Sequence, residues 1–187
     1  MTAPYFSLLT SISEINDYLY ISGFAPVRED NLRRLGITCV VDATNVPKKP
    51  WDGVDFVKVT VEDQESAKLD TYFDHVADKI HQHRKDGGKT LVHCAAGISR
   101  SASLCIIYFV KYENISLREA YLLVHEKRRI ISPNMGFWRQ MIEYAKREKH
   151  DYSVKLVRTK YREIPDVYLP SLHRSDKENA DDKVAKY

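Results

Sequence analysis

Short apolar runs alternate with longer amphipathic segments along most of this chain. The runs are rich in β-branched residues and carry apolar side chains at successive positions, which is typical of strands buried on both faces. Three such strands are predicted, at Tyr18–Ser22, Ile37–Ala43 and Thr90–His93, and a fourth, alternating strand at Val54–Val61. A turn is expected at Pro47–Pro50.

The segments between the strands repeat apolar residues at three- and four-residue spacing, which predicts helices that pack on one face. Their ends carry the usual signals, because Gly36 follows the first helix and Gly87 the second, while Ser116 and Glu119 form a capping box. The helices are predicted at 28–35, 70–85, 101–112, from Ser116 onward, and at 136–149.

Strands interleaved with helices predict an α/β fold, with a central, mostly parallel, twisted sheet flanked by helices. The periodicity fades after residue 150, although Val154, Ile164 and Val167 suggest that this part still packs on the domain. Residues 173–187 are charged with almost no apolar content, and we expect a disordered tail there. One domain is therefore predicted over residues 1–172.

Composition narrows the class of protein. The chain has 187 residues, of which 43% are hydrophobic and 29% charged, as in a soluble single domain. No apolar run approaches the length of a membrane-spanning helix, and the N-terminal residues do not resemble a secretory leader. The net charge of +3 is too small to predict a nucleic-acid partner.

Three cysteines, Cys39, Cys94 and Cys105, are too few for a disulfide framework and cannot form a structural zinc site by themselves. A reducing compartment is therefore expected, the cytoplasm and also the nucleus. Cys39 and Cys105 lie in apolar runs and are interpreted as core residues.

Cys94 differs because it directly follows a buried strand, in the sequence H-C-A-A-G-I-S-R-S. Ligands of parallel sheets bind at the carboxyl ends of strands. A loop of small residues that runs into a helix can turn its N–H groups inward and bind an anion. Arg100 adds a planar fork suited to phosphate oxygens. The helix dipole and this charge favour the thiolate of Cys94.

This loop resembles the signature loop of the cysteine-based protein tyrosine phosphatase superfamily. Four further blocks narrow the resemblance to the small atypical dual-specificity phosphatases, most closely the subgroup numbered 14, 18 and 21. It covers roughly Ile12 to Tyr168. The blocks are Y-F-D-H-V-A-D-K-I-H, S-L-C-I-I-Y-F-V-K-Y, P-N-M-G-F-W-R-Q-M-I-E-Y and I-P-D-V-Y.

The resemblance implies a phosphatase-like fold and a role for each matching residue. Cys94 would be the nucleophile that forms a cysteinyl-phosphate, and Arg100 would bind the phosphoryl oxygens. Ser101 would hydrogen-bond the sulfur and help it to leave. Asp63, at the matching position upstream, would be the general acid and then the general base. No metal or other cofactor is implied.

Other positions of the family pattern are implied to bind substrate or to support the site. His93 would brace the loop, and Asn134 would help to hold the surrounding loops. Arg129 and Ser132 depart from the family, which usually has Pro and Arg there, and these changes would alter the rim of the site. The substrate-binding residues implied are Ala95, Ala96, Gly97, Ile98, Ser99 and Arg100.

Two charged groups have simpler interpretations. His81 and His83 are two apart on a predicted helix and therefore on different faces, which argues against a metal pair. Lys127, Arg128 and Arg129 are interpreted as a solvated helix end that favours acidic peptides.

Hydrolysis of phosphotyrosine and phosphoserine or phosphothreonine on proteins is the leading hypothesis. The alternatives are a phosphopeptide-binding pseudophosphatase scaffold and a phosphatase of RNA 5′ ends or phosphoinositides. The latter kinds usually carry more basic residues inside the loop, whereas residues 95–99 here contain none. Phosphorylated proteins, with mitogen-activated and other signalling kinases among them, are the expected partners. The sequence does not indicate the oligomeric state.

Overall fold

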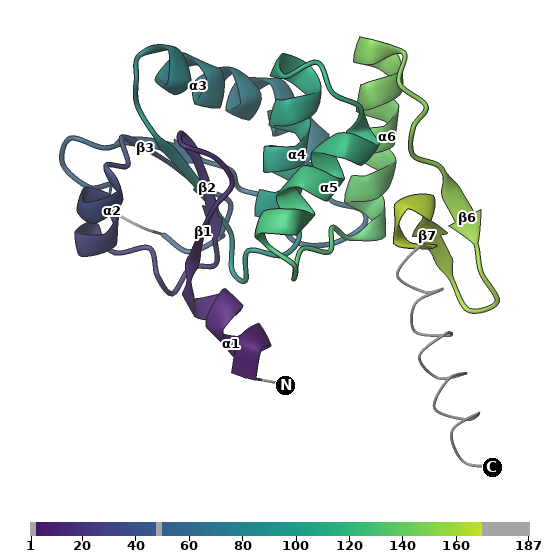
Figure 1. Cartoon of the computed structure of the whole chain (residues 1–187), viewed down its shortest axis with the longest axis horizontal. Coiled ribbons are helices and arrows are strands. Elements are labelled where there is room, and N and C mark those ends of the chain that lie inside the picture. Colours follow the sequence, from purple (N-terminus) through teal and green to yellow (C-terminus); the bar gives the residue numbers. More distant parts are fainter. Residues whose placement is uncertain (1–2, 48–49, 170–187) are drawn as a thin grey trace.

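The computed structural model of this chain describes residues 3–47 and 50–169 (Figure 1). The predicted tail at 173–187 and the C-terminal limit of the predicted domain lie outside the described residues. So does the centre of the turn expected at Pro47–Pro50.

A central five-stranded sheet carries the fold, as predicted. Its order is β1-β2-β5-β3-β4, and every neighbouring pair is parallel except the antiparallel pair β1 and β2. The strands are β1 (Ile12–Glu14), β2 (Leu19–Ser22), β3 (Cys39–Asp42), β4 (Asp55–Lys58) and β5 (Thr90–His93).

Helices cover both faces of this sheet. Figure 1 shows α2 (Glu29–Leu35) on one side, while α3 (Phe73–Lys85), α4 (Arg100–Tyr112), α5 (Leu117–Lys127) and α6 (Met135–Lys149) gather on the other. The larger core cluster contains residues of these four helices, and the smaller cluster contains Leu32 of α2.

The two core clusters explain the continuous apolar runs of the sequence. Along β5, Leu91 belongs to the smaller cluster and Val92 to the larger one, and Val40 and Val41 of β3 divide in the same way. Successive side chains point to opposite faces of a strand, so a strand with both faces covered needs apolar residues at every position.

Several helix ends follow the signals in the sequence. Gly36 closes α2 in the left-handed conformation at φ 69°, and Ser116 forms the predicted capping box with Glu119 at the start of α5. The helix predicted over 70–85 is divided into a 3₁₀ turn, η1 (Asp70–Tyr72), and α3.

The fourth strand is shorter than predicted. β4 ends at Lys58, although Val59 and Val61 remain buried. β4 is an edge strand whose neighbour β3 ends at Asp42, the partner of Lys58, so the following residues have no strand to pair with. Residues 59–63 therefore form a loop at the carboxyl edge of the sheet.

Four short elements were not predicted: α1 (Ala3–Thr10), β1, the hairpin of β6 (Leu156–Arg158) and β7 (Glu163–Pro165), and the 3₁₀ turn η2 (Asp166–Tyr168). Elements of three residues show too little periodicity to be recognised in sequence. The expectation that residues after 150 pack on the domain is confirmed, because Val154, Ile164 and Val167 are buried. None of the helices in the described ranges has the length and apolar character that crossing a membrane requires.

Candidate active site

The loop that begins at Cys94 lies at the carboxyl edge of the sheet. β5 is flanked by the parallel strands β2 and β3, whose last residues, Ser22 and Asp42, are both in register with His93. The chain leaves the sheet at Cys94 and enters α4 at Arg100. This is the position at which parallel sheets bind their ligands.

Four consecutive carbonyl groups of this loop, those of residues 95–98, point away from its centre. Each accepts a hydrogen bond from outside the loop. In order, the donors are the N–H of Phe24 (3.0 Å), Nη2 (3.1 Å) and Nε (2.8 Å) of Arg128, and the N–H of Ser132 (2.9 Å). Because a trans peptide directs its N–H opposite to its C=O, the amides of residues 96–99 face inward. The loop is thus a ring of donors suited to an anion.

At Gly97 of this loop, any side chain would force neighbouring atoms to move. Its φ is +71°, and a Cβ there would lie 2.5–2.6 Å from the backbone of Ser22 and from Nη2 of Arg128. The loop therefore packs tightly against the end of β2 and against Arg128.

The Cys94 sulfur lies beneath this ring and is 1% exposed. It accepts a hydrogen bond from the N–H of Gly97 at 3.2 Å, and the Ser101 hydroxyl is also 3.2 Å away. Ser101 belongs to the first turn of α4, whose positive dipole end faces the same place. An N–H donor and a helix N-terminus are thus both directed at the sulfur.

Arg100 lies beside the ring and is 7% exposed. Its Nη1 donates to the carbonyl of Val61 at 3.1 Å, which anchors one side of the guanidinium. Its Nε has no hydrogen-bond partner among the described residues and lies 3.7 Å from Oδ2 of Asp63. A buried donor without a partner is what an incoming oxyanion would satisfy.

Asp63 reaches the loop from the segment after β4. Its Oδ1 accepts hydrogen bonds from Ser99 Oγ at 2.7 Å and from Asn134 Nδ2 at 2.8 Å. Oδ2 accepts no hydrogen bond from a described residue and lies 3.7 Å from Nε of Arg100, so it is the oxygen free to face a bound group. Ser99 occupies the N-cap position of α4 but makes no capping hydrogen bond. Its hydroxyl donates to Asp63 Oδ1 instead.

The start of α6 holds the Asp63 segment against the loop. Asn134 caps α6 by accepting from the N–H of Phe137 at 3.0 Å, and its own N–H donates to Ser99 Oγ at 3.1 Å. The backbone of Gly136 touches Glu65 so closely that a Cβ would lie 1.9 Å from the Glu65 carbonyl oxygen. One residue, Asn134, thus connects helix and carboxylate through its side chain and the loop through its backbone N–H.

Arg128 corrects a prediction from the sequence, because it is not part of a solvated helix end. Its side chain is fully buried behind the loop. Besides the two bonds to the loop, its Nη1 donates to Ser13 Oγ at 3.1 Å and to the carbonyl of Ser11 at 3.3 Å. Burial lowers the pKa of Arg128 to about 10, against the opposing effect of the Cys94 and Cys105 thiols. Its exposed neighbour Arg129 agrees with the prediction.

The helical spacing of α5 was a signal that could have placed Arg128 inside. Leu117, Tyr121 and Val124 are the buried residues on one face of this helix, and Arg128 continues the same face. Runs of basic residues usually lie on the surface, which is the opposite of what this helical spacing indicates for Arg128.

His93 is buried beside the carboxylate of Asp42, with 3.7 Å between Nε2 and Oδ1. Burial raises the pKa of Asp42, but the hydrogen bonds from Thr44 and the charges of His93 and Lys58 outweigh burial and hold this pKa below its usual value. Asp42 is therefore a fixed negative charge under the end of β5. The bracing role of His93 stays a prediction.

The remaining candidates lie as follows. Cys39 and Cys105 are buried, as predicted, and burial raises the pKa of Cys39 to about 12. His81 stacks on Tyr112 with 3.9 Å between ring centroids, and His83 contacts Asp55 at 3.1 Å. In residues 3–47 and 50–169, no group of three or more His, Cys, Asp or Glu could hold a metal ion.

Comparisons with known proteins agree with this geometry. The sequence profile of the family described as "Dual specificity phosphatase, catalytic domain" matches residues 19–147. Dual specificity protein phosphatase 14 of Bos taurus is 45% identical over 162 residues, 86% of this chain and 82% of the relative. Dual specificity protein phosphatase 21 of Homo sapiens is 38% identical over 164 residues, covering 87% and 86%.

A solved structure is similar over most of its length. The crystal structure of a mouse putative dual specificity phosphatase, complexed with zinc tungstate, aligns with a TM-score of 0.70 and 29% identity. The alignment covers 74% of this chain and 88% of that one.

Proposed function

This chain belongs to the dual-specificity phosphatase family and is a protein phosphatase, and we propose that it acts through a phosphoenzyme formed on Cys94. The observation that carries this proposal is the outward direction of the four carbonyl groups of residues 95–98, because it leaves the amides of residues 96–99 facing the inside of the loop. The substrates are phosphotyrosine and phosphoserine or phosphothreonine in proteins.

Binding comes first. The inward amides and the guanidinium of Arg100 donate hydrogen bonds to the three non-bridging oxygens of the phosphoryl group, and Nε of Arg100 gains the partner that it lacks. Three features support this step: the burial of Arg100, its anchor on Val61 and the N-terminus of α4. The mouse relative is complexed with zinc tungstate, and tungstate is a tetrahedral oxyanion like phosphate.

In the first chemical step the Cys94 thiolate attacks phosphorus in line with the leaving oxygen. The S–P bond forms while the P–O bond of the phosphoester breaks. Asp63 donates a proton from Oδ2 to the departing oxygen, which leaves as a neutral phenol or alcohol. Oδ1 stays hydrogen-bonded to Ser99 and Asn134, so the carboxyl group keeps its orientation.

In the second step water attacks the phosphorus of the cysteinyl-phosphate. The Asp63 carboxylate takes a proton from this water, and the S–P bond breaks to release inorganic phosphate. The sulfur leaves as a thiolate, which the hydroxyl of Ser101 and the N–H of Gly97 stabilise by hydrogen bonds. The resting enzyme is thereby restored.

Hydrolysis of an aryl phosphate tests the proposal directly. Wild type is expected to turn over, Cys94→Ser to be inactive, and Asp63→Ala to lose most of its kcat while still forming the phosphoenzyme with a good leaving group. Cys39→Ala is a matched control, since Cys39 is the buried first residue of β3, at the end of the strand away from the loop. Full activity of Cys94→Ser would refute the proposal.

The chemical state of Cys94 gives a second test. Acid quenching during turnover of a labelled aryl phosphate should trap a label that is stable to acid and lies on the peptide containing Cys94. Vanadate, which adopts the five-coordinate geometry of the transition state, should inhibit competitively. A label found on any other residue would contradict the assignment of the nucleophile.

The same preparation separates the alternatives. Binding of phosphopeptides without turnover would indicate a pseudophosphatase scaffold. Faster turnover of triphosphorylated RNA or of an inositol lipid than of a phosphopeptide would indicate the other phosphatase classes. We propose signalling kinases among the substrates, and a cytoplasmic or nuclear site of action, because the thiolate must stay reduced.

A further inference from the structure

The β6–β7 hairpin ends in a turn that its own hydrogen bonds hold closed. Thr159 N–H and Oγ1 both donate to the carbonyl of Arg162, at 2.9 and 2.7 Å. Thr159 Oγ1 in turn accepts from the N–H groups of Tyr161 and Arg162, at 3.3 and 3.1 Å. The polar groups of Thr159 are thus satisfied within the turn, and the neighbouring side chains extend into solvent.

These side chains make a strongly basic surface. We call Arg158, Lys160 and Arg162 the basic tip; all three are exposed, and none forms an ion pair with any residue that the structure describes. The nearby acids are already occupied, because Glu163 pairs with Arg139 and Asp166 pairs with Arg118. Among the residues that the structure describes, none therefore neutralises the positive charge of the tip.

An aromatic side chain stands among these charges. Tyr161 is 86% exposed, the most exposed of the large hydrophobic residues in the described ranges. The ammonium group of Lys160 lies 5.6 Å from its ring centroid. Exposed tyrosine beside arginine is a composition typical of protein interfaces, because both side chains combine apolar area with hydrogen-bonding groups.

The hairpin is attached to the segment that carries Asp63. The guanidinium of Arg139 donates through Nη1 to Glu65 at 2.9 Å and through Nη2 to Glu163 at 2.8 Å. Glu65 is two residues from Asp63, and Glu163 is the first residue of β7. Figure 1 shows the hairpin projecting beyond α6, and the Arg139 bridge ties it to the segment two residues from Asp63.

We propose that the basic tip is a docking element for an acidic segment of the phosphoprotein substrate. The inference rests on the proposed function, because the segment must belong to a molecule whose phosphorylated residue reaches Cys94. Carboxylates and phosphates are the groups that three unpaired cations attract, and the hydrogen-bonded turn holds the backbone that presents these cations in place before binding. Tyr161 would lie against the apolar parts of the bound segment.

Such docking raises the affinity for substrate and leaves the chemical step unchanged. The tip contacts none of the reacting groups, so kcat for a small aryl phosphate should not depend on it. Exposed charge pairs are individually weak, and three together should change kcat/KM for an acidic substrate by about five- to tenfold. The advantage should shrink with added salt, because the charges are solvent-exposed.

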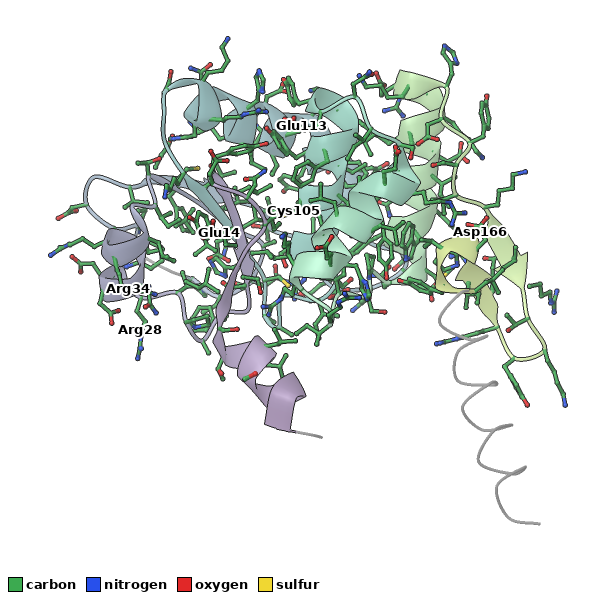
Figure 2. All side chains as sticks on the ribbon, in the orientation of Figure 1. Glu14, Arg28, Arg34, Cys105, Glu113 and Asp166 are labelled. Carbon is green, nitrogen blue, oxygen red and sulfur yellow. The ribbon has the colours of Figure 1, made fainter. Side chains whose placement is uncertain are left out.

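A pair of phosphotyrosine peptides tests the docking element. One carries a run of glutamates after a flexible spacer and the other carries glutamines, and each is made with the run on either side of the phosphotyrosine. The test variant is Arg158→Ala/Lys160→Ala/Arg162→Ala. The matched control, Arg28→Ala/Arg33→Ala/Arg34→Ala, removes the same charge from α2, which lies at the opposite end of the molecule from the hairpin (Figure 2).

With the run on one of the two sides of the phosphotyrosine, wild type and the α2 control should prefer the glutamate peptide to the glutamine peptide. The tip variant should lose about fivefold or more of that preference. Arg158→Lys/Arg162→Lys keeps the charge and should keep the preference. An unchanged preference in the tip variant, or an equal loss in the α2 control, would overturn the proposal.

Two further outcomes are distinguishable. If wild type fails to hydrolyse the aryl phosphate, the proposed function fails, and docking is then judged by the fluorescence anisotropy of the glutamate peptide with each variant. If phosphatidylserine vesicles bind wild type but not the tip variant, while the peptide preference is the same in both, the hairpin recognises a membrane surface and the proposal is wrong.

Discussion

The hydroxyl of Ser99 donates a hydrogen bond of 2.7 Å to the carboxylate of Asp63, although 36 positions of chain separate the two residues. Ser99 ends the loop of Cys94, and Asp63 lies in the segment after β4. This bond therefore joins the anion-binding loop to the proposed general acid. Its loss should affect proton transfer more than phosphate binding.

Ser99→Ala should lower kcat by about tenfold for substrates with poor leaving groups, because the Asp63 carboxyl loses part of its orientation. Good leaving groups need no proton, so the rate at which they form the phosphoenzyme should change little. The measurement is kcat for alkyl phosphates beside the burst-phase rate of phosphoenzyme formation from nitrophenyl phosphate. Ser103→Ala is the control, since its buried hydroxyl donates to the Ser99 carbonyl and not to Asp63. Equal losses with both substrates would contradict the positioning role.

Arg128→Met should destabilise the fold by about 3–5 kcal/mol, because it leaves buried carbonyl groups of the loop and Ser13 Oγ without donors. Urea denaturation measures this loss. Arg128→Lys should recover part of the stability but not the two-pronged bonding to residues 96 and 97. The adjacent Arg129→Met is exposed and should stay within about 0.5 kcal/mol of wild type. Similar stabilities for the two methionine variants would show that Arg128 does not brace the loop.

Gly136→Ala should lower both stability and kcat, even though alanine favours helix by about 0.5–1 kcal/mol over glycine. The new Cβ would meet the Glu65 carbonyl oxygen at 1.9 Å and push the Asp63 segment away from the loop. We expect a loss of about 1–3 kcal/mol in the free energy of unfolding. Gly53→Ala meets no atom within 4 Å but is strained at φ +74°, so it should lower stability and leave kcat unchanged. A fully active Gly136→Ala would mean that the segment shifts at no cost.

Asp42 should make the fold sensitive to acid. Its pKa in the folded state lies below the usual value, so its ionised form contributes stability above about pH 4 and loses it as the pH falls through the folded pKa. Asp42→Asn should therefore be less stable than wild type near pH 7, and the difference should narrow below about pH 4. Urea denaturation at both pH values measures this. Asp52→Asn, at an exposed position, should show no such convergence.

Much of the fold was predictable because local pattern and tertiary environment agree. The two-sided apolar runs of β3 and β5, the glycine after α2 and the Ser116 capping box each report their structure within a few residues. The elements that were missed are of another kind. β1 has three residues, and the β6–β7 hairpin has two strands of three, so neither is long enough for side-chain alternation to be recognised in the sequence.

The residues of the site also fall into two groups, those that local sequence predicts and those that only the structure brings together. Cys94, Arg100 and Ser101 lie within eight consecutive residues, so the geometry of one strand, loop and helix brings them together. Asp63 was assigned only through a resemblance, since several acids stand nearby in the sequence. In the structure, the carboxylate of Asp63 is the one that accepts hydrogen bonds from Ser99 and Asn134. Arg128 differs from the prediction, because a basic run lies in solvent unless the fold supplies buried acceptors. Here the carbonyl groups of residues 96 and 97 are those acceptors.

The sequence by itself determined the class of fold, the family and the chemistry of the Cys94 loop, since each depends on residues close together in the chain. Only the tertiary structure decided which distant groups meet there: Arg128 behind the loop, Asp63 on Ser99, and the hairpin linked by Arg139 to Glu65. Such contacts depend on how helices and strands pack in three dimensions. A hydrogen bond between residues far apart in the chain leaves no periodic signal in either segment.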